Sequence, residues 1–154
     1  MNIPEHFHFY HRRMVEFADT DQAGLMHFSN FFRFVESAEH AFFRSMGFRV
    51  HTAEGADHHG WPRVEVSCKY LRPARFEQTL QVCLHLDAIQ PSSLSYSFWI
   101  FDDAEKRHSP LATGSCAIVH VALDTATREI RKAPIPEALR HQLERAVTSP
   151  RSKS

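Results

Sequence analysis

The sequence predicts an α+β domain in which an antiparallel sheet packs against one long helix. Apolar residues recur at the three-and-four spacing of a helix most strongly between Phe31 and Met46. From residue 63 onward the pattern changes to the alternation of half-buried strands. The 154 residues are enough for one domain, which we expect over 1–148, followed by a polar, disordered tail over 149–154.

Composition limits the classes of partner. The chain has 18 Lys and Arg residues and 18 Asp and Glu residues, so its formal net charge is zero and nucleic-acid binding is disfavoured. It has no signal-peptide core and no apolar run near the roughly 20 residues that cross a bilayer, which predicts a cytoplasmic protein with no membrane partner. Cys68, Cys83 and Cys116 lie far apart, so we expect reduced, mostly buried side chains and neither disulfides nor a metal site.

The first strand and the long helix meet within residues 15–30. Bulky side chains over residues 10–17 predict a strand, and Gly24 supplies the backbone freedom of a tight turn. Asn30 is expected to be the N-cap of the helix, and Gly47 stands where a C-terminal cap belongs.

Two acids, Asp19 and Asp21, lie in this junction. Unpaired N–H groups and a partial positive charge at a helix start stabilise an oxygen that gains negative charge. A carboxylate beside such donors is the minimum equipment for acyl transfer. The alternative is that both acids only cap a turn, which is the commoner role of an Asp-Thr-Asp run.

Residues 48–61 are polar and aperiodic, which predicts a loop that could serve as a lid. Histidines and acids are frequent there, but their spacing matches no metal-ligand pattern, so we expect a solvated loop.

The second half of the chain predicts a meander of antiparallel strands. Alternation and turn residues predict strands over 63–70, 80–88 and 94–101, a charged hairpin over 102–108, and one strand covered on both faces over 111–123. They also predict a short C-terminal helix with Pro136 in its first turn and with Leu139, Leu143 and Val147 on one side. One cover of such a sheet is the long helix, and we expect the other to be a partner subunit.

Two stretches of the chain resemble one family. The pattern V-x-F-x-D-T-D-x-x-G-x-x-H-x-x-N over residues 15–30 resembles the 4-hydroxybenzoyl-CoA thioesterases and their acyl-CoA thioesterase relatives, and residues 70–75 are similar to the Y-x-x-P-A-R segment of the same proteins. The resemblance implies a single hotdog domain, an antiparallel five-stranded sheet wrapped around one long central helix. It also implies hydrolysis of an acyl- or aroyl-CoA without a metal or cofactor, in a homodimer or homotetramer with its active site at the subunit interface.

The resemblance also assigns roles to residues. Asp21 is the catalytic carboxylate, acting as nucleophile or general base, and the backbone N–H of Phe28 polarises the thioester carbonyl, whereas Asp19 anchors the turn. His27 either lines the pocket or packs at the helix entry. The substrate-binding candidates are Gly24, Asn30, Arg72 and Arg75. The two arginines, together with Arg131 and Lys132, are candidates for the CoA phosphates. The reason is that Gln90, Pro91, Ser92 and Ser93 replace the basic cluster that 4-hydroxybenzoyl-specific members carry after the third strand.

Alternatives remain open at this point. Hotdog enoyl-CoA hydratases or dehydratases also use a histidine and an acid at a subunit interface, and a non-catalytic module could bind acyl-CoA or an acyl carrier with the same fold. Glu36 and His40 lie one helical turn apart, where they either face the pocket or form an exposed pair.

Overall fold

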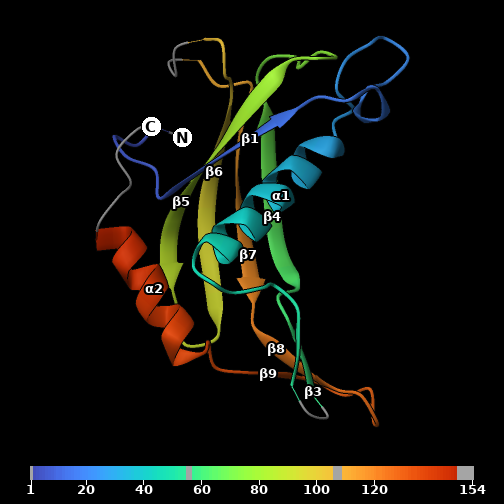
Figure 1. Cartoon of the computed structure of the whole chain (residues 1–154). Helices are drawn as coiled ribbons and strands as arrows, with labels where there is room; N and C mark the ends of the chain where they lie inside the picture. The colour runs from blue at the N-terminus through green and yellow to red at the C-terminus, as the bar shows by residue number, and fades with distance from the viewer. Residues whose placement is uncertain (1, 55–56, 106–108, 149–154) are drawn as a thin grey trace.

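A five-stranded antiparallel sheet packs one face against a long helix (Figure 1). The computed structural model describes residues 2–54, 57–105 and 109–148. The strand order is β1-β5-β6-β7-β4. The elements are β1 (Phe9–Met14), α1 (Asn30–Ser45), β4 (Arg63–Tyr70), β5 (Thr79–Ile89), β6 (Ser93–Asp102) and β7 (Ala112–Val119). The predicted five-stranded sheet and long helix are both confirmed.

The main core lies between α1 and the sheet. The apolar stripe of the helix supplies Phe34 and Phe43, which meet Phe98 and Ile118 from β6 and β7, and all four side chains are essentially inaccessible to solvent. Burying large aliphatic and aromatic side chains in this way supplies most of the stabilisation of a small domain. The packing also fixes the position of the helix start, where the candidate site lies.

The two ends of α1 differ in how well the sequence predicted them. Gly47 has φ +85° and donates its N–H to the carbonyl of Arg44, so the predicted C-terminal cap is confirmed. Asn30 is the first helical residue and Ser29 occupies the N-cap position, so the predicted cap is wrong by one residue. The Asn30 amide instead donates to the carbonyl of Asp19 over 2.9 Å.

The predicted first strand is too long. β1 ends at Met14, and Phe17–Asp19 forms a short 3-10 helix, η1, closed by reciprocal hydrogen bonds between Glu16 and Asp19. The side chain of Phe17 is 80% exposed, so this bulky residue is not a buried strand residue as the sequence pattern suggested. Side-chain capping therefore overrides strand propensity at this point.

A second, four-stranded sheet was not predicted. Its elements are β2 (Thr52–Glu54), β3 (Asp57–Gly60), β8 (Val121–Asp124) and β9 (Ile130–Lys132). Half of the residues expected to form a loop over 48–61 thus lie in two paired antiparallel strands. The single strand expected over 111–123 is two strands, because His120 donates its N–H to Ser92 and leaves the main sheet.

The C-terminal helix α2 (Glu137–Thr148) lies beside β5 (Figure 1). Its Leu139 and Leu143 are buried as predicted, whereas Val147 is 41% exposed. All three cysteines are free, and two of them are buried, as expected. The predicted tail over 149–154 and part of the charged hairpin lie outside the described residues.

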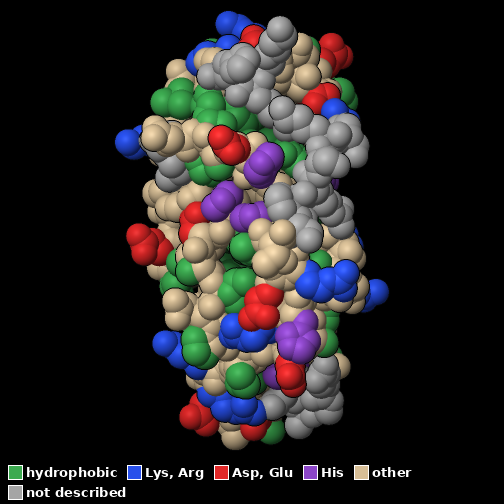
Figure 2. All heavy atoms as spheres, turned by 90° about the vertical axis from the view of Figure 1, so that its left-hand side faces the viewer, with side chains coloured by type: hydrophobic (Ala, Val, Ile, Leu, Met, Phe, Trp, Pro, Cys, Tyr) green, Lys and Arg blue, Asp and Glu red, His purple; other side chains and the backbone are tan. Residues whose placement is uncertain are grey.

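The surface carries mixed charge. On the face shown in Figure 2, basic and acidic side chains are interspersed and leave no broad area of one sign. None of the helices in the described ranges has both the length and the apolar character needed to cross a membrane.

Candidate active site

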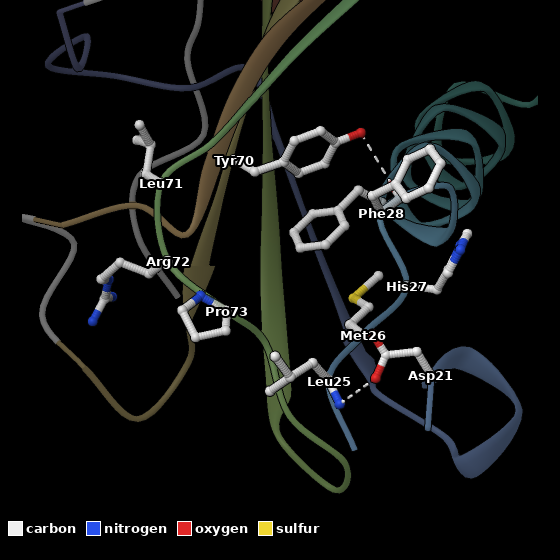
Figure 3. A pocket seen from close by; sticks show the side chains of 10 residues that line it. Asp21, Leu25, Met26, His27, Phe28, Tyr70, Leu71, Arg72 and Pro73 are labelled. Carbon is white, nitrogen blue, oxygen red and sulfur yellow. Dashed lines mark hydrogen bonds between the residues drawn. The ribbon is translucent and has the colours of Figure 1, made fainter. Parts of the chain in front are cut away.

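A cavity of about 410 Å³ opens at the N-terminal end of α1. Its walls come from the loop before the helix, from the first turn of α1 and from the end of β4, as Figure 3 shows. The lining residues are Asp21, Leu25, Met26, His27, Phe28, Phe31, Tyr70, Leu71, Arg72 and Pro73. The apolar majority suits an acyl or aroyl group, and the few polar groups can orient it.

Three backbone and side-chain contacts join the two stretches that resemble the family. The N–H of Met26 donates to the carbonyl of Ala74 over 2.8 Å, and Leu25 forms a β-bridge with Arg75. The hydroxyl of Tyr70 donates to the carbonyl of Phe28 over 3.1 Å. Segments nearly fifty residues apart therefore build one pocket.

Asp21 is exposed on the cavity wall (Figure 3). Its Oδ1 accepts the N–H groups of Ala23 (2.8 Å) and Leu25 (3.2 Å), which holds the carboxylate in one orientation. Gly24, at φ +71°, allows this tight turn. Oδ2 accepts no hydrogen bond from any described residue. One oxygen thus holds the turn, and the other is available for chemistry.

The backbone N–H of Phe28 is free of intramolecular acceptors in the described ranges, whereas its neighbours are paired. His27 donates its N–H to the carbonyl of Asp19, and Asn30 donates to the carbonyl of His27. The free donor stands two residues before α1, at the positive end of the helix dipole. It can polarise a carbonyl oxygen held in the cavity.

Asp19 and Asn30 stabilise the loop by hydrogen bonds that join it to the start of α1. The Asp19 side chain is 3% exposed, accepts the N–H of Glu16 over 3.1 Å and lies 3.6 Å from the guanidinium of Arg13. Its backbone carbonyl accepts hydrogen bonds from the N–H of His27 and from the side-chain amide of Asn30. Asp19 thus has the anchoring position that the resemblance implies. Asn30 is buried and is not among the residues that line the cavity, and its predicted role in substrate binding stays a prediction.

His27 lines the cavity and is exposed. Its Nδ1 lies 2.8 Å from the hydroxyl of Ser29, and its ring centroid is 4.4 Å from that of Phe28. Of the two positions considered for this residue, His27 has the one on a cavity wall, and its part in catalysis stays a prediction.

The two arginine candidates differ. Arg72 lines the cavity, but its guanidinium binds Glu105 over 2.7 Å and the carbonyl of Ser109 over 2.7 Å. Arg75 is exposed and has no acidic partner in the described ranges, although it does not line the cavity itself. Gly24 likewise shapes the turn without lining the cavity. Glu36 pairs with Arg63 over 3.3 Å, away from the cavity.

A buried polar group beneath α1 escaped the sequence analysis. Glu39 is 2% exposed, accepts a hydrogen bond from Tyr96 and lies 3.4 Å from the guanidinium of Arg63. Burial raises the pKa of the Glu39 carboxyl, and Arg63 and Tyr96 oppose this effect. Glu39 falls on the apolar stripe of the helix, and that position is the signal that could have revealed it.

The sequence analysis also gave no role to Tyr70, which belongs to the second matched segment, lines the cavity and donates to the carbonyl of Phe28.

Across the described residues, no three His, Cys, Asp or Glu side chains are placed to hold a metal ion together.

Several solved structures share this fold. A 1,4-dihydroxy-2-naphthoyl-CoA thioesterase from Synechocystis superposes with a TM-score of 0.72 at 23% identity, over 91% of this chain and 95% of that one. A Staphylococcus aureus protein solved in complex with CoA gives a TM-score of 0.75 at 16% identity, over 95% and 87% of the two chains. The predicted hotdog fold is confirmed.

Sequence comparison identifies the family. A protein of Aquifex aeolicus described as a proposed esterase is 31% identical over 97 residues, which cover 62% of this chain and 73% of that protein. The model of the thioesterase-like superfamily matches residues 15–143, which include both the Asp21 loop and the end of β4. The chain therefore belongs to the thioesterase-like superfamily, and its class of activity is thioester hydrolysis.

Proposed function

We propose that this protein hydrolyses the thioester of an acyl- or aroyl-CoA to the free acid and CoA. Asp21 acts as nucleophile or general base, and the N–H of Phe28 polarises the carbonyl. The observation that carries the proposal is that a carboxylate oxygen and a backbone N–H, both free of described partners, belong to residues that line one cavity.

The chemistry can follow either of two balanced routes. As a base, Asp21 takes a proton from water, the hydroxide attacks the carbonyl carbon, the C–S bond breaks and the CoA thiolate takes up the proton. As a nucleophile, Asp21 forms a mixed anhydride as the thiolate leaves, and water then hydrolyses the anhydride. In both routes a negative oxygen develops, and one well-placed donor such as Phe28 N–H is commonly worth about 3 kcal/mol in the transition state.

Neighbours and charges support a CoA substrate. The S. aureus protein of the same fold was solved with CoA, and the Synechocystis neighbour acts on a naphthoyl-CoA. Arg75 follows the cavity wall and carries a guanidinium that no described acid neutralises, so it is the better candidate for a CoA phosphate. Arg72 would first have to leave Glu105.

The cavity also supports a homo-oligomer with its active site at the subunit interface, as a dimer or a tetramer. Phe28 is 62% exposed and Leu71 is 53% exposed, although both line the proposed acyl pocket. Apolar walls left in solvent are typical of surfaces that a partner covers.

Hydrolysis of a panel of aliphatic and aromatic acyl-CoA esters, followed by the release of free thiol, tests the proposal. We expect Asp21→Asn and Asp21→Ala to lower kcat by at least about 100-fold, the range typical of a lost acid-base group. The matched control is Asp124→Asn. Asp124 also accepts two backbone N–H groups in an exposed turn, from Ala126 and Thr127, but lies in β8 away from the cavity.

Undiminished turnover in both Asp21 variants would overturn the catalytic assignment. Addition of water to an enoyl-CoA with the thioester left intact would indicate a hydratase instead. Tight binding of acyl-CoA without release of thiol would indicate a binding module.

A further inference from the structure

Phe28 is held by its backbone rather than by its ring. The Phe28 side chain is 62% exposed, so burial in the core does not fix the position of this residue. In the peptide unit before Phe28, the carbonyl of His27 accepts the N–H of Asn30 over 2.9 Å. A peptide unit is planar, so a hydrogen bond to its carbonyl also restricts the direction of its N–H. That N–H is the free donor of Phe28.

The peptide unit after Phe28 is held by Tyr70. The Tyr70 hydroxyl donates to the carbonyl of Phe28 over 3.1 Å, and Figure 3 shows this hydrogen bond joining the end of β4 to the segment before α1. The N–H of the same unit, from Ser29, lies 3.4 Å from Nδ1 of His27, which is a longer contact. The backbone of Phe28 can rotate unless both of its peptide units are held, and Tyr70 supplies the shorter contact to the second one.

The phenol ring of Tyr70 is itself fixed. Its centroid lies 5.1 Å from that of Phe31 and 6.4 Å from that of Phe28, and both pairs are edge to face, a favourable arrangement for aromatic rings. Partial burial and the neighbouring Cys68 thiol raise the pKa of the Tyr70 hydroxyl above its ordinary value of 10. The hydroxyl therefore keeps its proton at neutral pH and remains a donor to the Phe28 carbonyl.

The segment that follows Tyr70 holds the other half of the candidate site. The two residues after Tyr70 donate their N–H groups to the carbonyl of Leu111 over 2.8 and 3.1 Å, next to the first residue of β7. The buried Ala74 accepts the N–H of Met26 over 2.8 Å, and Met26 follows the turn that the Asp21 carboxylate closes. Residues 70–74 thus contact both the Asp21 loop and the backbone of Phe28.

We propose that Tyr70 is a positioning residue for thioester hydrolysis, because its hydroxyl fixes the backbone of Phe28 and thereby directs the free N–H of Phe28 at the substrate carbonyl. This inference rests on the proposed function, in which that N–H polarises the thioester. Together with the carbonyl of Ala74, the Tyr70 hydroxyl sets the separation between the Asp21 carboxylate and the N–H donor. Tyr70 contacts no reacting atom in this role and acts through the backbone of Phe28.

A donor that Tyr70 orients acts mostly on the transition state. Negative charge develops on the carbonyl oxygen only as the carbonyl carbon is attacked, so a misdirected N–H weakens binding of the transition state more than binding of the substrate. Loss of an oxyanion donor altogether lowers kcat by about 100- to 1,000-fold. Tyr70 orients the donor without being the donor, so loss of its hydroxyl should have a smaller effect of about tenfold.

The variant Tyr70→Phe removes the hydroxyl and keeps the ring. We expect kcat on the best substrate of the acyl-CoA panel to fall about tenfold, with KM changed by less than about twofold. The matched control is Tyr10→Phe, which removes a hydroxyl from β1 at a position that does not line the cavity and should leave both constants unchanged. Tyr70→Leu also removes the ring from the cavity wall, so it should raise KM as well. An unchanged kcat in Tyr70→Phe, or a loss confined to KM, would overturn the proposal.

Infrared difference spectroscopy reports the direction of the N–H without turnover. The probe is S-phenacyl-CoA labelled at the carbonyl carbon, in which a methylene group between sulfur and carbonyl prevents hydrolysis. A hydrogen bond to the carbonyl weakens the C=O bond and lowers its stretching frequency. We expect the band of the bound probe to move to higher frequency in Tyr70→Phe and to keep its wild-type position in Tyr10→Phe. A band that Tyr70→Phe leaves unmoved would show that the hydroxyl does not direct the donor.

Turnover and band position separate this inference from the proposed function. If Tyr70→Phe raises the carbonyl frequency of the bound probe but the wild type hydrolyses no acyl-CoA, the positioning of the N–H stands and the proposed function fails. If the wild type hydrolyses acyl-CoA and Tyr70→Phe changes neither kcat nor the band, the proposed function stands and the positioning role fails. A wild type that neither binds the probe nor hydrolyses any acyl-CoA would overturn both.

Discussion

Asp19 and Asp21 stand two residues apart in the same loop, yet their surroundings differ in every respect. The Asp19 carboxylate is buried and contacts the N–H of Glu16 and the guanidinium of Arg13, and the Asp19 carbonyl accepts hydrogen bonds from the start of α1. The Asp21 carboxylate is exposed on a cavity and keeps one oxygen free of described partners. Burying the Asp19 carboxylate removes it from water, and hydrogen bonds within the protein replace the lost hydration, whereas the Asp21 carboxylate stays accessible to water.

The comparison distinguishes a residue that stabilises the loop, Asp19, from one whose carboxylate is available for chemistry in the cavity, Asp21. Both acids cap turns, so capping alone does not distinguish them. They differ in the burial of the carboxylate and in whether one carboxylate oxygen is without a described hydrogen-bond partner. Substitutions at the two positions should therefore affect different measurements: stability at Asp19 and turnover at Asp21.

The largest effect on stability is expected from Asp19→Ala. It removes a buried carboxylate that accepts the N–H of Glu16 and faces the guanidinium of Arg13, which should lower the free energy of unfolding by about 2 kcal/mol. Urea unfolding followed by circular dichroism measures this, with Asp21→Ala as the control at less than about 1 kcal/mol. Equal losses at both positions would contradict the comparison.

A smaller effect is expected from Gly24→Ala, which tests how far the Asp21 turn depends on backbone conformation. Gly24 has φ +71° and open space around it, so the cost is conformational strain of about 1 kcal/mol. Gly60→Ala is the matched control, since Gly60 also has open space but lacks a positive φ. Unfolding curves for the two variants should differ by that amount, and identical curves would show that the turn adapts without strain.

The smallest effect on stability is expected from Glu39→Gln. This variant extends the comparison to a buried acid whose carboxylate contacts side chains, those of Tyr96 and Arg63. Burial raises the folded-state pKa of Glu39 above its ordinary value of 4.5. The folded protein therefore binds the proton more tightly, and the stability contributed by Glu39 is lost as pH rises through the raised pKa. Gln does not titrate, so the stability of the variant relative to wild type should increase from about pH 5 to about pH 8.

The control for this prediction is Glu36→Gln, which also removes a carboxylate from Arg63 but at an exposed position. Its stability relative to wild type should show little change over the same pH range. A relative stability of Glu39→Gln that decreases with pH would reverse the assigned direction of the pKa.

Local signals made much of this molecule predictable. The alternation over β4, β5 and β6, the apolar stripe of α1 and the cap at Gly47 all depend on neighbouring residues. The succession of a carboxylate, a turn and a helix start was predictable for the same reason, whereas the choice of Asp21 as the catalytic acid came from the family resemblance and stays a proposal.

Contacts between distant residues decided the remaining features. The polar stretch before β4 becomes a hairpin because β3 pairs with β8, about 65 residues later. His120 ends β7 because its N–H donates to the carbonyl of Ser92, and the side chain of Asn30 is held by the carbonyl of Asp19. No periodicity of the chain records these partners.

The pairing of β1 with β5 has a consequence for the order of folding. Phe9 lies opposite Leu84, 75 residues along the chain, whereas Ile89 and Leu94 close β5 onto β6 through a short turn. Short-range pairing forms with less loss of chain entropy than long-range pairing. The β5-β6 hairpin therefore precedes the docking of the N-terminal strand. We therefore expect the cavity beside Asp21, whose loop follows β1, to take shape only after the β5 residues that pair with β1 have been made.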